Sequence, residues 1–242
     1  MKKIFRVSLT ALSILLLTAC GKPQNSVSVS DSQSQVENLP GVLGNNIAST
    51  TPVVLAPVSP APELIAKCTR CHGNDGDGIN PFFARIGGQQ EKYLALELKA
   101  FRDCTVIGKE CIRAGRDGRD FMYKPTDVSN LSDQDIVNLS HYFATRPQPQ
   151  PVTGGDANLI AQGKDIYMNG VGDDVQSCVD CHGAKGLGNG NTPALSGQFD
   201  RETIKQMANY KNKRRKNTMM VSIALSLSDD QVKALAAYLS SL

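Results

Sequence analysis

The chain has 242 residues, with 26 lysines and arginines against 23 aspartates and glutamates, and it contains no tryptophan. So small a charge imbalance excludes the strongly basic surface on which nucleic-acid binding depends. No apolar segment reaches membrane-spanning length, which excludes a protein built on transmembrane helices.

The N-terminus has the pattern of a secretory signal peptide. Residues 7–17 are apolar but too short to cross a bilayer, and basic residues precede them. Residues 17–21 read Leu-Thr-Ala-Cys-Gly, which resembles a bacterial lipobox. The sequence therefore predicts a signal peptide at 1–19 and a diacylglycerol on Cys20. The alternative is an ordinary signal peptide with an incidental cysteine.

The same segment predicts the location of the mature chain. Loss of residues 1–19, which hold three of the 26 basic residues and no acidic one, leaves a formally neutral protein. Lys22 follows Gly21 and no aspartate stands next to Cys20, so by analogy with other lipoproteins we expect the outer membrane. The prediction is a periplasmic protein that contacts the membrane through its lipid anchor and has no nucleic-acid partner.

The segment after Cys20 has the composition of a linker. Residues 20–61 are rich in serine, glutamine, asparagine, valine and proline, carry few charges and show no helical or strand period. We expect a disordered, lipid-anchored tether.

The remainder of the chain is an internal repeat. Three elements recur in the same order: Cys68–Gly73 with Cys178–Gly183, Gly88-Gln89 with Gly197-Gln198, and Leu131–Ile136 with Leu227–Val232. A segment rich in proline and glycine separates the copies. The repeat predicts a first domain at 62–147, a linker at 148–155 and a second domain at 156–242.

Helical signals dominate both copies. Ser132 with Asp135, and Ser228 with Gln231, have the spacing of capping boxes that open the last helix of each copy. Further helices are expected at 91–102, 156–169 and 201–211, and no segment has the pattern of a strand ladder. The predicted fold class is all-α.

Each copy contains a Cys-x-x-Cys-His motif. Two thiols one helical turn apart can add to the two vinyl groups of one haem, and the adjacent histidine then becomes the proximal iron ligand. Zinc is the rival for a Cys-x-x-Cys pair, but it needs four ligands, and a secreted, duplicated motif followed at once by histidine argues against it. We expect two covalent haem c groups, held by Cys68, Cys71 and His72 and by Cys178, Cys181 and His182.

The sixth iron ligand distinguishes a carrier from an enzyme. Of the three histidines only His141 remains, and it lies off the apolar face of its helix, so we expect a surface residue. Methionine is the alternative, because histidine–methionine ligation closes the iron to exogenous ligands and raises its potential. In the second copy the candidates are Met219 and Met220, expected on the loop before the last helix, whereas Met168 and Met207 are expected in the core.

A methionine shortly before Leu-Ser-Asp, together with the repeated motifs, makes residues 62–242 resemble the cytochrome c4 group of diheme class I cytochromes c. The resemblance implies two tandem class I cytochrome c lobes related by pseudo-twofold symmetry. It implies Met220 as the axial ligand of the second haem. The corresponding position in the first copy is Lys124, but a loop two residues longer would bring in Met122, the only methionine of that copy, and we expect Met122 to be the ligand. Ligation by Lys124 and a vacant sixth position are the alternatives.

The resemblance also implies partners for the proximal histidines. In that family the backbone carbonyl of a loop proline accepts a hydrogen bond from the histidine, and Pro81 and Pro193 stand at plausible positions. The alternative is that both are ordinary loop prolines.

Two cysteines and a basic run remain. Cys104 and Cys111 lie in a segment that the second copy lacks, and in an oxidising compartment we expect them to form a disulfide worth about 2–3 kcal/mol. The alternative is a thiolate haem ligand, as in diheme thiosulfate dehydrogenases. The basic cluster, defined as Lys211, Lys213, Arg214, Arg215 and Lys216, either steers an acidic redox partner or is a solvated loop, or it contacts lipid headgroups or haem propionates.

The sequence as a whole predicts an electron carrier and not an enzyme. Electrons are expected to enter through one haem and leave through the other, between a redox protein donor and an acceptor such as a terminal oxidase or a periplasmic reductase. The alternatives are a diheme enzyme similar to thiosulfate dehydrogenase or peroxidase, and a haem subunit of a larger dehydrogenase.

Overall fold

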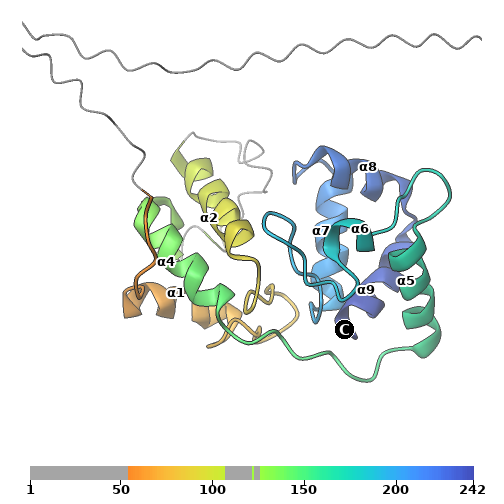
Figure 1. The fold of residues 1–242 in the computed structure, drawn as a ribbon, viewed down its shortest axis with the longest axis horizontal. Coiled ribbons are helices and arrows are strands. Elements are labelled where there is room, and N and C mark those ends of the chain that lie inside the picture. The colour runs from red at the N-terminus through yellow and green to blue at the C-terminus, as the bar shows by residue number, and fades with distance from the viewer. Residues whose placement is uncertain (1–53, 107–121, 123–125) are drawn as a thin grey trace, which may run out of the picture. The chain divides into compact units, whose positions relative to one another are not determined.

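The structure is a computed structural model that describes residues 54–106, 122 and 126–242, without the side chains of 104–106. Within these residues the only pairing of extended backbone is two isolated bridges, Val171 with Val175 and Asn189 with Thr192. The predicted all-α class is therefore confirmed. The elements, shown in Figure 1, are α1 (Pro62–His72), α2 (Glu91–Val106), the 3-10 helix η2 (Val128–Asn130), α4 (Asp133–Ala144), α5 (Ala157–Asn169), α6 (Val179–His182), α7 (Asp200–Lys211), α8 (Thr218–Ser226) and α9 (Asp229–Ser240).

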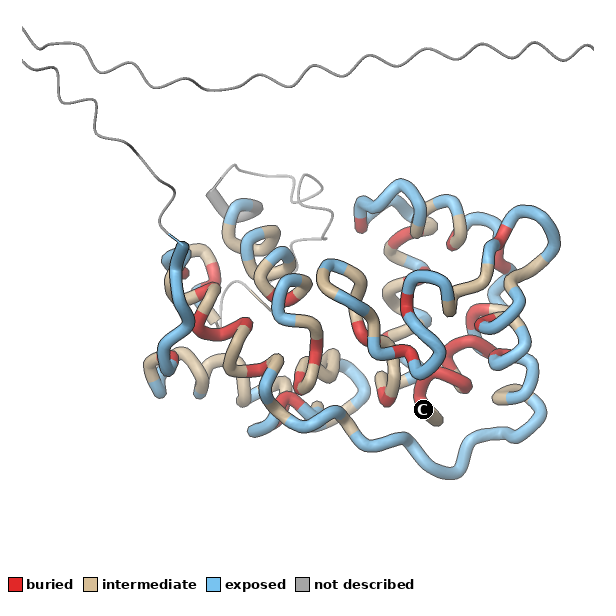
Figure 2. Tube along the Cα trace, viewed as in Figure 1, coloured by how far each residue is buried: buried red, intermediate tan, exposed pale blue. Residues whose placement is uncertain are grey.

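The first lobe has its own apolar core, in which α2 packs against α4 and η2. Ile136, Leu139 and Phe143 point inward from α4, as their spacing along a helix predicts, and Figure 2 shows this helix with a buried stretch. The remaining buried members are Leu94, Val128 and Leu131.

The second lobe is built around α9, which packs against α5 and α7, while α7 also packs against α8. Gly163 on α5 lies against the backbone of α9, since a Cβ atom at this position would overlap the carbonyl oxygen of Ala234. A glycine here lets two helices approach more closely than any other residue would allow. Tyr167, Val232 and Leu239 are among the side chains buried between these helices.

The predicted helix starts agree closely with the structure. Both capping boxes are present: Ser132 Oγ accepts from the Asp135 amide at 3.1 Å, and Ser228 Oγ accepts from the Gln231 amide at 3.2 Å. The side chain of Asp156 caps α5. Because these caps satisfy amides that have no partner inside the helix, they define each start from local sequence.

One predicted loop is wrong. Met219 and Met220 lie in the first turns of α8 and not on an irregular segment. Asn217 caps this helix, because its side chain accepts from the Met220 amide at 3.1 Å. The cap is an ordinary helix start signal, but the helix that follows is short and apolar on most of its surface, so it has no clear polar face.

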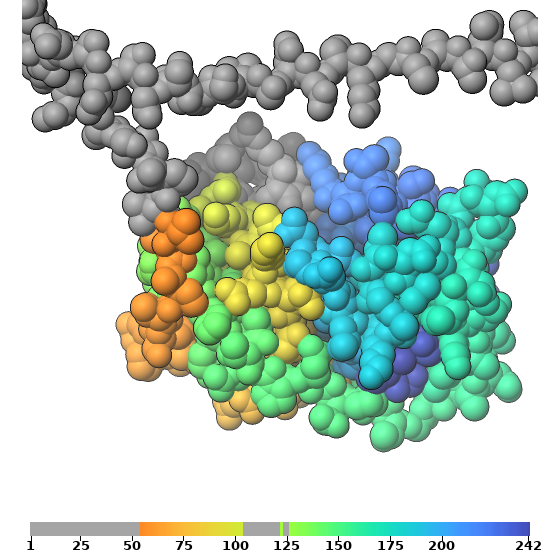
Figure 3. Space-filling model, viewed as in Figure 1, coloured from red at the N-terminus to blue at the C-terminus, as the bar shows by residue number. Residues whose placement is uncertain are grey.

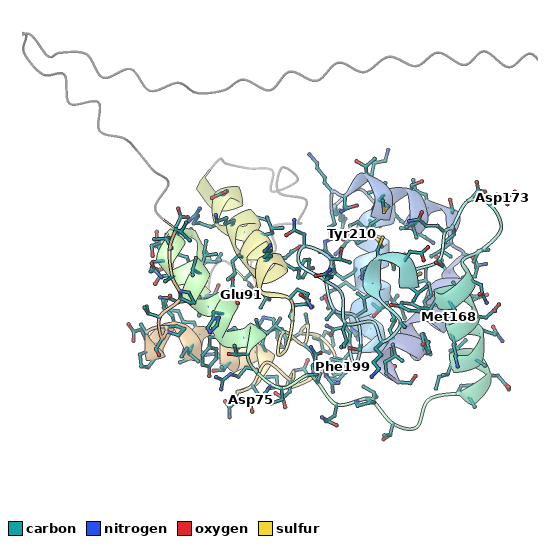
Figure 4. All side chains as sticks on the ribbon, viewed as in Figure 1. Asp75, Glu91, Met168, Asp173, Phe199 and Tyr210 are labelled. Atoms are coloured by element: carbon teal, nitrogen blue, oxygen red, sulfur yellow. The ribbon has the colours of Figure 1, made fainter. Side chains whose placement is uncertain are left out.

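The two methionines expected in the core differ in their burial. Met207 on α7 is 8% exposed and belongs to the core of the second lobe, as predicted. Met168, labelled on α5 in Figure 4, is 36% exposed, so the prediction is wrong for this residue. Its neighbour Tyr167 is fully buried, so Met168, about 100° further round the helix, lies toward the exposed side of α5.

Several predictions fall on other parts of the chain. The signal peptide, Cys20 and residues 20–53 of the tether lie outside the described residues, as does Cys111 of the expected disulfide. These stay predictions. In the part of the chain that the structure covers, no helix is both long enough and apolar enough to cross a membrane.

Candidate haem-binding sites

The two Cys-x-x-Cys-His motifs occupy equivalent positions at helix ends. His72 is the last residue of α1 and His182 the last residue of α6. Gly73 and Gly183 follow with positive φ angles of 84° and 77°, which glycine adopts without strain. The glycine after each motif therefore turns the chain away immediately after the histidine.

The first cysteine of each motif faces its own apolar core. Cys68 packs against the buried cluster of the first lobe and Cys178 against that of the second. Burial raises the pKa of each thiol to about 11. Both sulfur atoms are thus held inside a lobe, on the side where an apolar group would be enclosed.

The proximal histidines are oriented by backbone carbonyls. His72 Nδ1 lies 2.7 Å from the Ala84 oxygen, and His182 Nδ1 lies 3.0 Å from the Pro193 oxygen. A carbonyl only accepts, so Nδ1 carries the hydrogen and Nε2 keeps the lone pair that an iron ion needs. Burial lowers the pKa of both imidazoles, although the same carbonyl bonds oppose the shift, and this favours the neutral, ligating form.

The prediction for Pro193 is confirmed, but Pro81 is wrong. Ala84 provides the carbonyl in the first lobe, and it stands at the same distance before Gly88-Gln89 as Pro193 does before Gly197-Gln198. The interaction uses only the backbone oxygen, so any residue at that place in the loop can supply it.

Met122 lines the same apolar cavity as Cys68 in the first lobe. The rest of the lining is five apolar side chains, Leu64, Leu98, Val128, Leu131 and Leu139, together with Lys67 and Thr126. The structure therefore brings a thioether and a motif thiol to one cavity. Lys124, the alternative ligand, lies outside the described residues.

In the second lobe the structure distinguishes the two adjacent methionines. Met220 is partly buried and packs against the core that also contacts Cys178. Met219 is 54% exposed, and its sulfur accepts from Gln176 Nε2 at 3.8 Å. The surface position of α8 can be followed in Figure 3. Met220 is thus the methionine placed on the inner side, as the resemblance implied.

His141 is a surface residue, as predicted. Its side chain is 45% exposed and its Nδ1 lies 3.1 Å from Glu91 Oε2. Across the described residues no three side chains of the His, Cys, Asp and Glu types gather as a zinc site requires. A partly buried first thiol, a histidine oriented for ligation and a thioether beside the apolar core fit a covalently bound haem in each lobe.

The basic cluster is only partly a surface feature. Arg215 is 9% exposed, and its Nη2 donates to Glu97 Oε1 of α2 at 2.7 Å and also to Tyr93. The expectation of a solvated or partner-steering charge is therefore wrong for this residue. Lys211 forms an ion pair with Asp229 at 2.8 Å. The exposed members are Lys213, Arg214 and Lys216.

Two glutamines have a role that the sequence did not reveal. Gln89 is 8% exposed and bonds to both backbone groups of Ala194, donating to its oxygen at 2.9 Å and accepting from its amide at 2.6 Å. Gln198 bonds in the same way to Arg85, at 3.0 Å in both directions. The repeated Gly-Gln element was the available signal, but only the fold shows that each glutamine reaches the opposite lobe.

Comparison with known proteins agrees with this arrangement. The sequence profile of the cytochrome c family matches residues 59–146 and 160–242. Each match contains one Cys-x-x-Cys-His motif. The two motifs therefore correspond to two covalent haem c groups, as the sequence predicted.

Individual relatives are named as cytochromes c4 or as an electron acceptor. Cytochrome c4 of Azotobacter vinelandii is 34% identical over 73% of this chain and 85% of its own. The cytochrome c4 structure from Acidithiobacillus ferrooxidans superposes with a TM-score of 0.64 at 34% identity, over 73% of this chain and 99% of that one. A thiosulfate dehydrogenase electron acceptor of Stutzerimonas stutzeri is 28% identical over 71% of this chain and 76% of its own.

Proposed function

Since the chain belongs to the cytochrome c family, as a diheme protein of the cytochrome c4 type, we propose that it carries electrons between two redox proteins of the bacterial periplasm. The haem in each lobe supplies a one-electron couple. The residues of the chain attach it, orient its proximal ligand and shield it from water. No substrate-converting role is required of any of them.

The observation that carries the proposal is a methionine on the inner side of both lobes. Met122 shares its cavity with Cys68, and Met220 shares its core with Cys178. We assign these two thioethers as ligands that would hold the haem irons together with His72 and His182. An iron with histidine and methionine on its two faces has no open position for a substrate, so it exchanges electrons without forming bonds.

The proposed location rests on the N-terminal sequence. The lipobox-like segment ending at Cys20 supports a lipid-anchored protein of the periplasm, held at the outer membrane. Replacement of Cys20 by serine is expected to release haem protein into the soluble periplasmic fraction. Unchanged membrane association of the C20S protein would contradict the anchor.

The proposed electron donor is a dehydrogenase of the thiosulfate-oxidising type. A relative named as the electron acceptor of such an enzyme supports this choice. A terminal oxidase or a periplasmic reductase is the proposed acceptor. In this scheme the chain receives electrons from the enzyme and is not itself the catalyst.

The test is whether thiosulfate reduces the purified holoprotein directly. We expect no reduction by thiosulfate alone and rapid reduction of both haems once a catalytic amount of thiosulfate dehydrogenase is added, monitored by visible absorbance. Direct reduction by thiosulfate would favour the enzyme alternative. Absence of reduction in the complete mixture would contradict the proposed donor and leave the carrier function in place.

A further inference from the structure

The hydrogen bonds of Gln89 and Gln198 end on the two peptide groups that hold the proximal histidines. The amide of Arg85 and the carbonyl of Ala84 belong to one peptide bond. Gln198 Oε1 accepts from its N–H at 3.0 Å, while its carbonyl accepts from His72 at 2.7 Å. A continuous chain of two hydrogen bonds therefore runs from a side chain of the second lobe to the histidine of the first.

The reverse connection exists in the other lobe. The amide of Ala194 and the carbonyl of Pro193 share a peptide bond. Gln89 Oε1 accepts from its N–H at 2.6 Å, and its carbonyl accepts from His182 at 3.0 Å. Each lobe thus provides the glutamine that completes the hydrogen-bond chain of the other.

Hydrogen bonds in such a chain strengthen one another. A peptide whose N–H is bonded to an acceptor becomes more polarised, so its carbonyl oxygen accepts more strongly from the histidine. A histidine that donates a stronger bond from Nδ1 is a more basic ligand through Nε2. A more basic ligand stabilises the oxidised iron, which lowers the reduction potential.

We propose that Gln89 and Gln198 are positioning residues that tune the haem of the opposite lobe through these shared peptide groups. Gln89 acts on the second haem through His182, and Gln198 acts on the first through His72. The reduction potential of each haem then depends on contact with the other lobe. This inference rests on the two haem sites of the proposed function but not on the identity of any partner.

A neighbouring residue offers a matched control. Gln90 is also a glutamine with two bonds to the second lobe, donating to Leu187 O at 2.9 Å and accepting from the Gly190 amide at 3.1 Å. Its partner Leu187 shares a peptide bond with Gly188, whose amide donates to the backbone oxygen of His182 at 2.9 Å, but neither partner's peptide bonds the imidazole of a proximal histidine. Loss of Gln90 therefore removes contacts between the lobes without interrupting either chain.

The test compares Gln89→Leu, Gln198→Leu and Gln90→Leu in the full-length protein with both haems attached. In Gln89→Leu we expect the reduction equilibrium of the second haem to shift toward the reduced form by on the order of two- to tenfold, with the first haem unchanged. In Gln198→Leu the first haem should shift toward the reduced form by a similar factor, with the second haem unchanged. Gln90→Leu should shift neither.

The histidine hydrogen bonds give a second readout. In reduced protein labelled with 15N-histidine, the Nδ1–H proton resonance of His182 should move upfield in Gln89→Leu, and that of His72 in Gln198→Leu. Gln89→Glu in its protonated form keeps both the acceptor for the Ala194 amide and a donor for the Ala194 oxygen, so at a pH where this carboxyl is protonated it should not reproduce the Gln89→Leu shift.

Specific outcomes would overturn the inference. Equal shifts of both haems, or an effect of Gln90→Leu as large as that of Gln89→Leu, would show that loosened lobe contact is the cause. A shift confined to the lobe that carries the mutation would show a local effect and no coupling through the shared peptides. Failure of the wild-type protein to titrate as two haems would instead contradict the proposed function itself.

Discussion

At the scale of single residues, Met122 and Met220 belong to different lobes, so each haem site can be altered by a substitution that leaves the other unchanged. Met220 stands where the cytochrome c4 pattern places its ligand, whereas Met122 is displaced by two residues relative to the Leu-Ser-Asp element. Both nevertheless lie on the inner side of their lobes. In the first lobe, the cavity lining therefore identifies the methionine more directly than counting residues back from Leu131 does.

Replacement of each methionine by histidine should affect one haem only. Histidine is a stronger electron donor than a thioether, so we expect Met220→His to lower the potential of the second haem by on the order of 0.2 V, within the roughly 0.8 V that axial ligands span. Met122→His should do the same to the first haem. Redox titration with loss of the 695 nm methionine–iron band is the measurement. An unchanged first haem in Met122→His would remove Met122 as its ligand.

The buried pair between Arg215 and Glu97 predicts a stability effect. Their side chains are only 11% and 19% exposed, and although burial opposes the charge, Tyr93 and Glu97 raise the pKa of Arg215 above its usual value. Glu97→Gln leaves this guanidinium without its charged partner, which should reduce the free energy of unfolding by about 3 kcal/mol.

The control for this prediction is the exposed ion pair of Lys211 with Asp229. Lys211→Met should leave the denaturation midpoint unchanged, because solvent screens an exposed pair. Chemical denaturation of the holoproteins, followed by circular dichroism, measures both variants. Equal losses of unfolding free energy in Glu97→Gln and Lys211→Met would mean that burial of the Arg215–Glu97 pair does not increase its contribution to stability.

At the scale of helices, the sequence predicted most starts and missed features that depend on tertiary contact. Helix α4 follows from a local capping box, and the second lobe's α5 follows from Asp156 as its cap. In contrast, burial of Arg215 depends on α2, which is distant in sequence. The bonds of Gln89 and Gln198 likewise depend on the opposite lobe. The repeated Gly-Gln pair therefore indicated that the two glutamines occupy equivalent positions, but not which groups they bond.

The contact of α5 with α9 gives a prediction at this scale. Gly163→Ala gains helix propensity of about 1 kcal/mol, but its Cβ would overlap the Ala234 carbonyl and push the helices apart. We expect a net loss of about 2 kcal/mol or more of unfolding free energy. Gln162→Ala, at an exposed position of the same helix, should be close to neutral. Thermal melts measure both variants, and equal melting temperatures for Gly163→Ala and Gln162→Ala would contradict the close approach of α5 to α9.

At the scale of the whole molecule, the two haems should differ in accessibility. The first lobe carries both the displaced methionine and the segment of Cys104 and Cys111 that the second lobe lacks. A thioether held less rigidly binds iron more weakly, so the first haem should have the lower potential. It should also bind cyanide or imidazole first, with a rate at least severalfold higher. Spectral titration in wild type and in Met122→His distinguishes the haems, and equal rates for both would contradict the prediction.

The central claim is that two haems, each closed by histidine and methionine, make this chain an electron carrier. The most direct test is a spectroelectrochemical titration of the mature holoprotein that counts electrons per chain and follows the 695 nm band. We predict two electrons per chain and a 695 nm intensity that corresponds to two methionine-ligated haems in the oxidised state. Uptake of a single electron, or a band that accounts for one haem with the other open to ligands, would contradict the account.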